Sequence, residues 1–378
     1  MAGPLEGIRV VEAAQIYATP GLGMYLADFG ADVIKVEPPE GDACRRQHTS
    51  PVLGDLSKPF IHLNRNKRSI VVDIRKPAGR SILLRLLERA DVFVVNFRPG
   101  VPERLGLHYE ALERLNPRLI YVSLTGWGPS GPRKGRRGYD LLVQARAGLL
   151  DARRYQDGTP VLPPFMAADP SAPMLLAYGV ALALYEREKS GRGQKIESSL
   201  FAATIAMQNS QLVRLERDPT FPSTMNHASF LYRCADDKHL ILIIVVTEEW
   251  VRLCRALGLA QFAEDPRFAT YMDRARHHAV IDDILAPTFA TRPRDHWLAL
   301  FANEDLPCEP IVTRDDLLAD PQARENGYLT DVDDQRAGRV TMMGAPLRLS
   351  RTPAGFRRPA PHLGQHADEV LREIGLTP

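Results

Sequence analysis

Asp169 combines a residue type and a sequence position that could support covalent chemistry. It directly precedes Pro170, and an aspartate followed by proline at the first helical position is a common helix start. In one interpretation Asp169 is only a helix cap. In the other, the positive field of the helix N-terminus keeps its carboxylate ionised and nucleophilic, and nearby helix amides hold a developing oxyanion. The two interpretations are compatible, and the residues alone leave both open.

Two basic groups are candidates for a phosphate site. Residues 133–137, Arg-Lys-Gly-Arg-Arg, form the densest basic cluster and lie in a loop rich in glycine and proline, directly after a predicted strand. This cluster is either a solvated surface loop or a clamp for a phosphorylated ligand at the carboxyl end of the sheet. Residues 64–68, Asn-Arg-Asn-Lys-Arg, precede another predicted strand and could share that task.

A third candidate follows the predicted strand at 92–95. Residues 96–100 place an amide, an aromatic ring and a guanidinium within one turn, and Arg104 follows one turn later. This segment is either an ordinary loop or an element that binds a nucleotide base or a phosphate.

The elements that must position these residues alternate between strands and helices. Apolar, β-rich runs predict strands at 8–12, 32–36, 69–73, 92–95 and 119–123, and helical spacing predicts helices at 21–29, 78–90 and 109–115. The pattern predicts an α/β fold with a Rossmann-like, mainly parallel sheet. No G-x-G-x-x-G follows the first strand, so a dinucleotide redox cofactor is not indicated. Two further helices are predicted at 171–189 and 197–216.

A change of character after the proline-containing segment 218–222 predicts a second domain. We expect a large domain over 1–222, completed by 325–378, and a small α+β domain over 223–324. The small domain has two predicted strands within 230–246, around the polar turn 236–238, and helices near 248–257 and 279–289. The C-terminal stretch has a predicted strand at 339–349 and a helix at 367–374, which we expect to dock on the large domain.

Composition excludes several other classes of protein. The 378 residues carry 48 basic and 46 acidic side chains, a net charge of +2, which argues against a nucleic-acid binder. The four cysteines lie far apart, so neither a zinc site nor a redox dithiol is indicated. The first residues lack the features of a signal peptide, and the longest apolar run, 240–246, is far shorter than a membrane span of about 20 residues. We therefore expect a cytoplasmic protein with no membrane partner.

Several motifs, taken in order, resemble the class III CoA-transferase family, which includes formyl-CoA and carnitine CoA-transferases and the related α-methylacyl-CoA racemases. The resemblance covers nearly the whole chain. It is carried by residues 4–12, 26–37, 63–70, 90–100, 116–128, 190–194 and 362–366.

The cysteines form no C-x-x-C pair, and His277 and His278 lie in a polar stretch, so we expect no metal. The resemblance implies an acyl-CoA substrate and a carboxylic acid acceptor. It places the nucleophile at Asp169. It also implies coenzyme A contacts at Gln15, Ile16, Tyr17, Ala18, Val72, Arg75, Asn96, Phe97, Arg104, Arg137 and Tyr139. The family further implies a homodimer of interlocked chains, with the site between the large domain of one chain and the small domain of the other.

Three departures from the family pattern bear on function. Ala172-Pro173 stands where a small residue and glycine are usual, and no glycine lies between Gly193 and Gly258, where oxalate-type transferases carry a glycine-rich flap. Gly138-Tyr139-Asp140 replaces the Gly-His-Asp of the racemases, whose chemistry needs that histidine.

We therefore expect a CoA-transferase that works through an aspartyl anhydride and an aspartyl-CoA thioester. The alternatives are an acyl-CoA racemase or epimerase and a CoA-binding protein without turnover. The identities of the donor and acceptor acids stay open.

Overall fold

The computed structural model describes residues 3–152, 154–155, 157–218, 229–335 and 337–377. These residues form two compact units, Met1–Asn209 with Pro321–Pro378, and Ser210–Asp320. The domain boundary expected at residue 222 lies outside the described residues.

The first unit is built on a six-stranded sheet in the order β3-β2-β1-β4-β5-β6, with every neighbouring pair parallel. This confirms the predicted α/β fold with a parallel sheet. The central strands are nearly continuous apolar runs because helices cover both faces of the sheet. The strands are β1 (Arg9–Ala13), β2 (Asp32–Glu37), β3 (Arg68–Val71), β4 (Val92–Val95), β5 (Ile120–Thr125) and β6 (Lys195–Ser199).

The sixth strand corrects one expectation. The predicted helix at 197–216 is wrong at its start, because Lys195–Ser199 pairs with β5 as an edge strand and helix α8 covers only Leu200–Met207. The sequence Lys-Ile-Glu-Ser-Ser has few apolar residues, since an edge strand is only partly covered, and it therefore lacks the signal of a buried strand. Ser199 also caps α8, its Oγ accepting the N–H of Ala202 at 3.0 Å.

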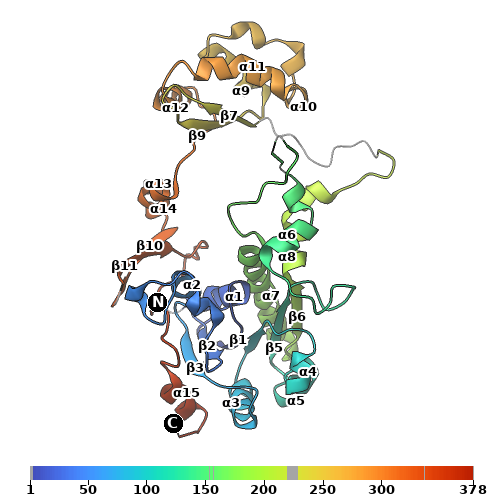
Figure 1. Cartoon of the computed structure of the whole chain (residues 1–378), viewed down its shortest axis with the longest axis vertical. Coiled ribbons are helices and arrows are strands. Elements are labelled where there is room, and N and C mark those ends of the chain that lie inside the picture. Colours follow the sequence, from blue (N-terminus) through green and yellow to red (C-terminus); the bar gives the residue numbers. More distant parts are fainter. Residues whose placement is uncertain (1–2, 153, 156, 219–228, 336, 378) are drawn as a thin grey trace. The chain divides into compact units, whose positions relative to one another are not determined.

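Helices pack on both faces of this sheet (Figure 1). On one face, α1 (Ala18–Asp28), α6 (Asp140–Arg146), α7 (Ala168–Ser190) and α8 share a core with β1, β4 and β5. On the other face the core includes α3 (Pro77–Leu87), α5 (Tyr109–Leu115) and the C-terminal α15 (Ala367–Glu373). Shorter helices of this unit are α2 (Lys58–Leu63), α4 (Val101–Leu105) and α14 (Pro321–Glu325).

The C-terminal segment returns to the sheet of the first unit. Val370 and Ile374 enter the core beside α3, and the Arg68 guanidinium bonds to Glu369 at 2.7 Å and to Glu373 at 2.6 Å. Before it, β10 (Leu329–Asp334) and β11 (Gly338–Met343) form an antiparallel hairpin. The strand predicted at 339–349 is therefore present but ends at Met343, and its partner β10 was not predicted.

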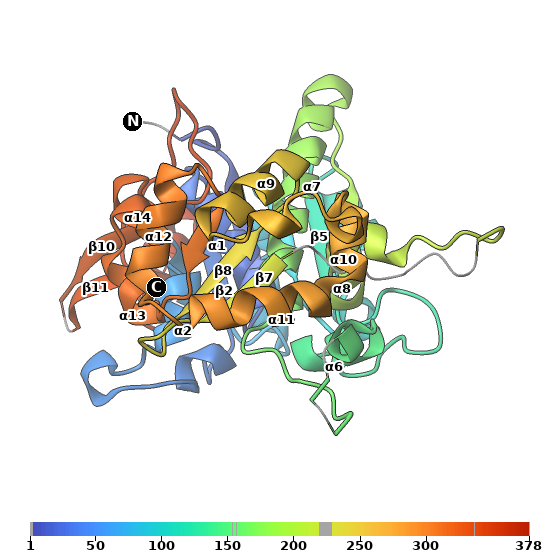
Figure 2. The same ribbon diagram turned by 90° about the horizontal axis from the view of Figure 1, so that it is seen from above.

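The second unit is a small α+β fold. Strands β7 (Ser229–Arg233) and β8 (His239–Ile243) pair antiparallel around the predicted turn, and β9 (Cys308–Pro310) joins β8. Helix α11 (His278–Phe289) lies along β7 and β8 (Figure 2), with Tyr232 stacked on Phe289 at 4.5 Å between ring centroids. The remaining helices are α9 (Thr247–Ala256), α10 (Tyr271–Arg276), α12 (Arg294–Asn303) and α13 (Arg314–Ala319).

Across the described ranges, we find no helix that is both long and apolar enough to span a membrane.

Candidate active site

A cavity of about 500 Å³ opens at the carboxyl ends of β1, β4 and β5. The strand order reverses between β1 and β4, and doubly wound sheets bind ligands at such a switch point because the loops diverge there. Nine of the expected site residues line this cavity. They are Gln15, Ile16, Tyr17, Ala18, Asn96, Phe97, Arg137, Tyr139 and Asp169.

The turn that leads from β1 into α1 is held in an unusual conformation. Ile16 has φ 77°, a left-handed conformation that a β-branched residue adopts at a cost of about 1–3 kcal/mol. Asn96, after β4, clamps the preceding residue: its Nδ2 donates to the Gln15 carbonyl at 2.7 Å and its Oδ1 accepts the Gln15 N–H at 3.2 Å. The Ile16 N–H donates to Asp42 Oδ1 at 3.0 Å. The strained turn is therefore fixed from two sides.

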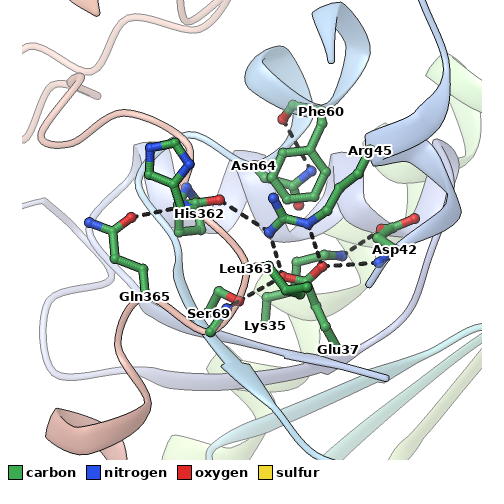
Figure 3. A network of polar contacts seen from close by, with 12 residues as sticks. Lys35, Glu37, Asp42, Arg45, Phe60, Asn64, Ser69, His362, Leu363 and Gln365 are labelled. Atoms are coloured by element: carbon green, nitrogen blue, oxygen red, sulfur yellow. Dashed lines mark hydrogen bonds and ion pairs between the residues drawn. The ribbon is translucent and has the colours of Figure 1, made fainter. Parts of the chain in front are cut away.

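Asp42 belongs to a buried network of charged residues (Figure 3). Lys35 Nζ lies 2.9 Å from Asp42 Oδ2 and 3.0 Å from Glu12 Oε1, and it donates to the Ala14 carbonyl at 2.9 Å. Burial by itself would lower the pKa of Lys35, but the carboxylates of Asp42, Glu12 and Glu37 raise it above its usual value. The lysine therefore stays charged and supports the loop that precedes the cavity.

A second part of the network joins the sheet to the C-terminal segment. Arg45 binds Glu37 through two bonds of 2.6 and 2.8 Å and donates to the Pro361 carbonyl at 3.1 Å. Ser69 donates to Glu37 Oε1 at 2.6 Å. Although burial alone would raise the pKa of Glu37, these partners and Lys35 lower it.

The basic group at 64–68 belongs to this structural network, so the expectation that it shares a phosphate site is wrong. Arg65 is buried against Asp28 at 2.6 Å, Lys67 against Glu12 at 2.8 Å, and Arg68 against Asp32 at 2.5 Å. Each charge is already paired inside the protein and does not face the cavity.

Asp169 presents its partly exposed side chain to the cavity. Helix α7 begins at Ala168, so Asp169 is its second residue, and the N-cap position is occupied by Ala167, which makes no side-chain capping bond. The interpretation of Asp169 as a helix cap is therefore wrong. Its backbone N–H donates to Oδ2 of the buried Asp140, at the start of α6, at 2.9 Å.

The charge state of Asp169 also differs from expectation. Burial, and then the nearby charge of Asp140, raise the pKa of Asp169 to about 7. The positive field of the helix N-terminus does not keep this carboxyl fully ionised at neutral pH, because desolvation opposes the charged form. Near pH 7 the protonated and ionised forms coexist.

A second, smaller cavity of about 230 Å³ adjoins the first, and the two share Ala13, Gln15 and Phe97 in their walls. Val72 and Arg75 line this second cavity, and the Arg75 guanidinium bonds to Asp73 at 2.7 Å. Arg104, on α4, is exposed and lines neither cavity. The structure therefore brings every expected contact except Arg104 to one of two connected hollows.

The loop containing the basic cluster borders the first cavity. Trp127 Nε1 donates to the Arg137 carbonyl at 3.0 Å, and the Arg133 guanidinium lies 5.1 Å from the Trp127 ring centroid. Gly126 and Gly138 cross so closely that a Cβ on Gly138 would lie 2.4 Å from the Gly126 Cα. Arg136 and Arg137 line the cavity, and neither forms an ion pair with any described residue.

Sequence reasoning missed two residues of this site. Trp127 lines the cavity, and Asp140 lies beneath Asp169. Trp127 falls in a family-like motif, which was a usable signal, whereas Asp140 was notable only as the neighbour of Tyr139 in the sequence. Arg136, a member of the predicted basic cluster, does line the cavity. No group of three or more His, Cys, Asp or Glu side chains is placed to hold a metal ion in the described part of the chain.

The fold and site together define a doubly wound α/β protein with a cavity at the switch point of its sheet, beside a carboxyl group at a helix start. The chain belongs to CoA-transferase family III, whose family model matches residues 5–367. It is thus an enzyme that acts on CoA thioesters and carboxylic acids.

Relatives of known name agree with this assignment. The chain is 35% identical to a succinate–glutarate CoA-transferase of Agrobacterium fabrum, over 98% of this chain and 96% of the relative. It is 33% identical to a succinyl-CoA–D-citramalate CoA-transferase of Chloroflexus aurantiacus, over 99% and 95%. The crystal structure of a CAIB/BAIF family protein from Brucella suis matches with a TM-score of 0.84 at 32% identity, over 99% of this chain and 100% of that one. These findings confirm the resemblance drawn from the sequence.

Proposed function

We propose that this enzyme moves CoA from an acyl-CoA thioester to a carboxylic acid, with Asp169 as the nucleophile. One observation carries the proposal. Among the described residues that line the main cavity, Asp169 is the one carboxylate, and none is serine, cysteine, histidine or lysine. The described lining also holds the hydroxyls of Thr19, Thr125, Tyr17 and Tyr139, but no histidine or lysine base that would activate them. A covalent intermediate at this position therefore has Asp169 as its candidate carrier.

The reaction proceeds in two symmetrical halves. An Asp169 carboxylate oxygen attacks the donor thioester carbon, the C–S bond breaks, and CoA thiolate leaves with its electron pair. The thiolate attacks the aspartyl carbonyl of the resulting anhydride, releasing the donor carboxylate and leaving an aspartyl-CoA thioester. The acceptor carboxylate then attacks that thioester, and the freed thiolate attacks the acceptor carbonyl, which regenerates Asp169. No net proton is gained or lost.

We further propose that CoA spans the two connected cavities. Val72 and Arg75 would contact one end of the cofactor. Helix α4, which carries Arg104, lines the same cavity through Val101 and Leu105. Gln15, Ile16, Tyr17, Ala18, Asn96, Phe97, Arg137 and Tyr139 would guide the pantetheine arm toward Asp169. The shared wall at Gln15 and Phe97 supports a single ligand that passes from one hollow to the other. Such a long handle supplies the positioning energy that a weak carboxylate nucleophile needs.

A dicarboxylic acid is the substrate class that we propose. The relatives named above act on succinate, glutarate or D-citramalate, each of which has a second carboxylate. Arg136, which lines the cavity and has no ion-pair partner in the described residues, is suited to bind that group. CoA exchange between succinyl-CoA or acetyl-CoA and a panel of mono- and dicarboxylic acids tests this; equal rates with monocarboxylic acids would contradict it.

The nucleophile is tested by replacing Asp169. Asp169→Ala is expected to abolish CoA exchange while leaving CoA binding intact. In the wild-type enzyme incubated with acyl-CoA, hydroxylamine should convert Asp169 to a hydroxamate that peptide mass spectrometry detects. Turnover by the alanine variant would refute the proposal. Absence of the hydroxamate together with absence of exchange would favour a CoA-binding protein without turnover.

A racemase is the second candidate function, and the cavity gives it less support. Racemisation needs two acid/base groups on opposite sides of the α-carbon. Apart from Asp169, the side chains of the described lining that could donate or accept a proton in this role are the phenols of Tyr17 and Tyr139. Deuterium incorporation at the α-carbon of a thioester substrate in heavy water would support the racemase instead.

We also propose that the enzyme is a homodimer, in which the small domain of one chain completes the site on the large domain of the other. The outer face of α7 supports this proposal. It exposes large apolar side chains at helical spacing, namely Met174, Leu175, Tyr178, Leu182 and Tyr185. A continuous apolar stripe of this kind marks an interaction surface. Light scattering should give the mass of a dimer, and Tyr178→Glu should shift it toward the monomer; a monomeric wild type would overturn this.

A further inference from the structure

Asp140 is a buried carboxylate directly beneath the proposed nucleophile. It is the first residue of α6, and the residue is only 5% exposed. One oxygen, Oδ2, accepts the backbone N–H of Asp169 at 2.9 Å, and the other, Oδ1, accepts a hydrogen bond from Nε2 of Gln144. Two N–H donors from different helices thus converge on one side chain.

Burying the Asp140 carboxylate in this way costs folding free energy. No lysine, arginine or histidine forms an ion pair with Asp140 among the residues that the structure describes. A buried carboxylate without a cation loses much of its hydration, and two neutral donors replace only part of it. An asparagine would make a similar tether with no buried charge, so the charge calls for a role beyond packing.

Asp140 acts on the position of Asp169 through the start of α7. Its bond to the Asp169 N–H uses a helix N–H that has no partner within the helix. This bond ties the first turn of α7 to α6, which in turn fixes where the Asp169 side chain leaves the backbone. A displacement of about 1 Å at a reacting group typically costs about 100-fold in rate.

We propose that Asp140 is a positioning residue for the reaction, which directs the Asp169 carboxyl toward the cavity through its hydrogen bond to the Asp169 backbone N–H and places a negative charge close to that carboxyl. This inference rests on the proposed role of Asp169 as nucleophile. It assigns to Asp140 no contact with substrate.

The surroundings of Asp169 agree with an electrostatic influence of Asp140 on its carboxyl. Burial is the larger cause of its raised pKa of about 7, and the Asp140 charge is the other cause. The attacking form is the carboxylate, so the acidic limb of the rate profile follows this pKa. The other titratable or charged groups that line the same cavity are Tyr17, Tyr139, Arg98, Arg136 and Arg137.

Two substitutions separate the geometric from the electrostatic contribution. In Asp140→Asn the remaining oxygen still accepts the Asp169 N–H. The new amide can donate to Gln144 Oε1, a buried atom that now lacks a hydrogen-bond partner, once the Gln144 amide turns over. This variant keeps the tether and removes the charge. Asp140→Glu keeps the charge and moves the acceptor by one methylene.

The experiment measures kcat and KM for CoA exchange across pH 5 to 9 in the full-length enzyme. Asp140→Asn is expected to keep most of its plateau kcat while its acidic limb moves to lower pH, since one cause of the raised pKa is gone. Asp140→Glu is expected to lose about 10- to 100-fold in kcat with little change in KM and with its acidic limb near that of the wild type. Asp368→Asn, the same change in the exposed first turn of α15, is the control and should leave both quantities unchanged.

Each outcome bears on the proposal. If Asp140→Asn leaves the acidic limb in place, or if Asp140→Glu retains wild-type kcat, Asp140 does not position or tune Asp169. Circular dichroism and thermal unfolding of both variants confirm that they are folded. Failure of the proposed function is recognised separately, because Asp169→Ala would then retain exchange whatever the Asp140 variants do.

Discussion

The backbone N–H of Ile16 donates to Oδ1 of Asp42 at 3.0 Å, so a buried acid from a distant loop holds the strained turn at the cavity. Asp42 is also an ion-pair partner of the fully buried Lys35. One carboxylate therefore connects the internal charge network to the turn that lines the main cavity.

Replacing Asp42 is expected to weaken both connections. Asp42→Ala leaves Lys35 with fewer carboxylates and Ile16 without its acceptor, and breaking a buried ion pair costs about 3–5 kcal/mol. We expect a lower free energy of unfolding in urea and a raised KM for acyl-CoA. Asp315→Ala, an exposed acid on α13, is the comparison that should alter neither. An unchanged KM in folded Asp42→Ala would show that the Ile16 turn needs no support.

The wild-type rate is expected to depend on pH through Asp169. Its pKa is raised to about 7, and the carboxylate is the reactive form, so kcat/KM should rise with pH through about 7 and level off above it. Steady-state rates at constant ionic strength check this. A profile that is flat from pH 5 to 8 would mean that Asp169 ionises below pH 5, and it would contradict the raised pKa of about 7.

Gly23 in α1 is expected to tolerate no side chain. A Cβ there would lie 1.9 Å from Glu12 Oε2 and 3.0 Å from Lys67 Nζ, both parts of the buried network. Gly23→Ala should therefore destabilise the protein by about 1–3 kcal/mol or more, the usual cost of overpacking. Gly179→Ala in α7, whose nearest neighbour is an Ile196 methyl at 3.4 Å, should be neutral or stabilising by up to about 1 kcal/mol. Urea unfolding of the two variants measures the change in the free energy of unfolding. Equal changes in Gly23→Ala and Gly179→Ala would contradict the packing argument.

Arg68 is expected to hold the C-terminal helix on the sheet. It is buried and contacts Asp32, Glu369 and Glu373 at 2.5 to 2.7 Å. Arg68→Met should speed hydrogen exchange in residues 367–373, because Glu369 and Glu373 lose their common partner. Arg372→Met, whose exposed guanidinium lies 3.8 Å from Asp368, should not. Equal exchange in the two variants would mean that apolar packing of Val370 alone anchors α15.

Trp127 is expected to report ligand binding. It lines the main cavity, whereas Trp250 and Trp297 are buried in the core of the second unit. Added CoA should change the tryptophan emission of the wild type but not that of Trp127→Phe. If the variant responded as strongly as the wild type, the signal would come from the other unit.

Much of the architecture followed from local sequence pattern. The strand at 92–95 and the helix at 109–115 have the predicted bounds in the structure, because a fully buried strand and an amphipathic helix each leave a periodic signature. The motif around Asp169 and the residues after the first and fourth strands also pointed to the same cavity. These features depend on residues close together in the chain.

What the sequence could not specify depends on pairing across the fold. Residues 64–68 have the composition of an anion site, yet Arg65, Lys67 and Arg68 bind acids that lie 36 to 305 positions away. Only the folded chain brings those acids near. Lys195–Ser199 became a strand because the edge of β5 was free to pair with it, which its own polar pattern did not reveal.

The sequence by itself determined the class of fold, the family and the identity of the candidate nucleophile. Tertiary structure decided the environment of that nucleophile. Asp140 is 29 positions from Asp169, and only the packing of α6 beside α7 places its carboxylate against the Asp169 backbone. In that setting burial, and then the charge of Asp140, raise the pKa of the Asp169 carboxyl. The electrostatic energy of a charge depends on its distance to other charges and on its exclusion from water, and both quantities exist only in the folded molecule.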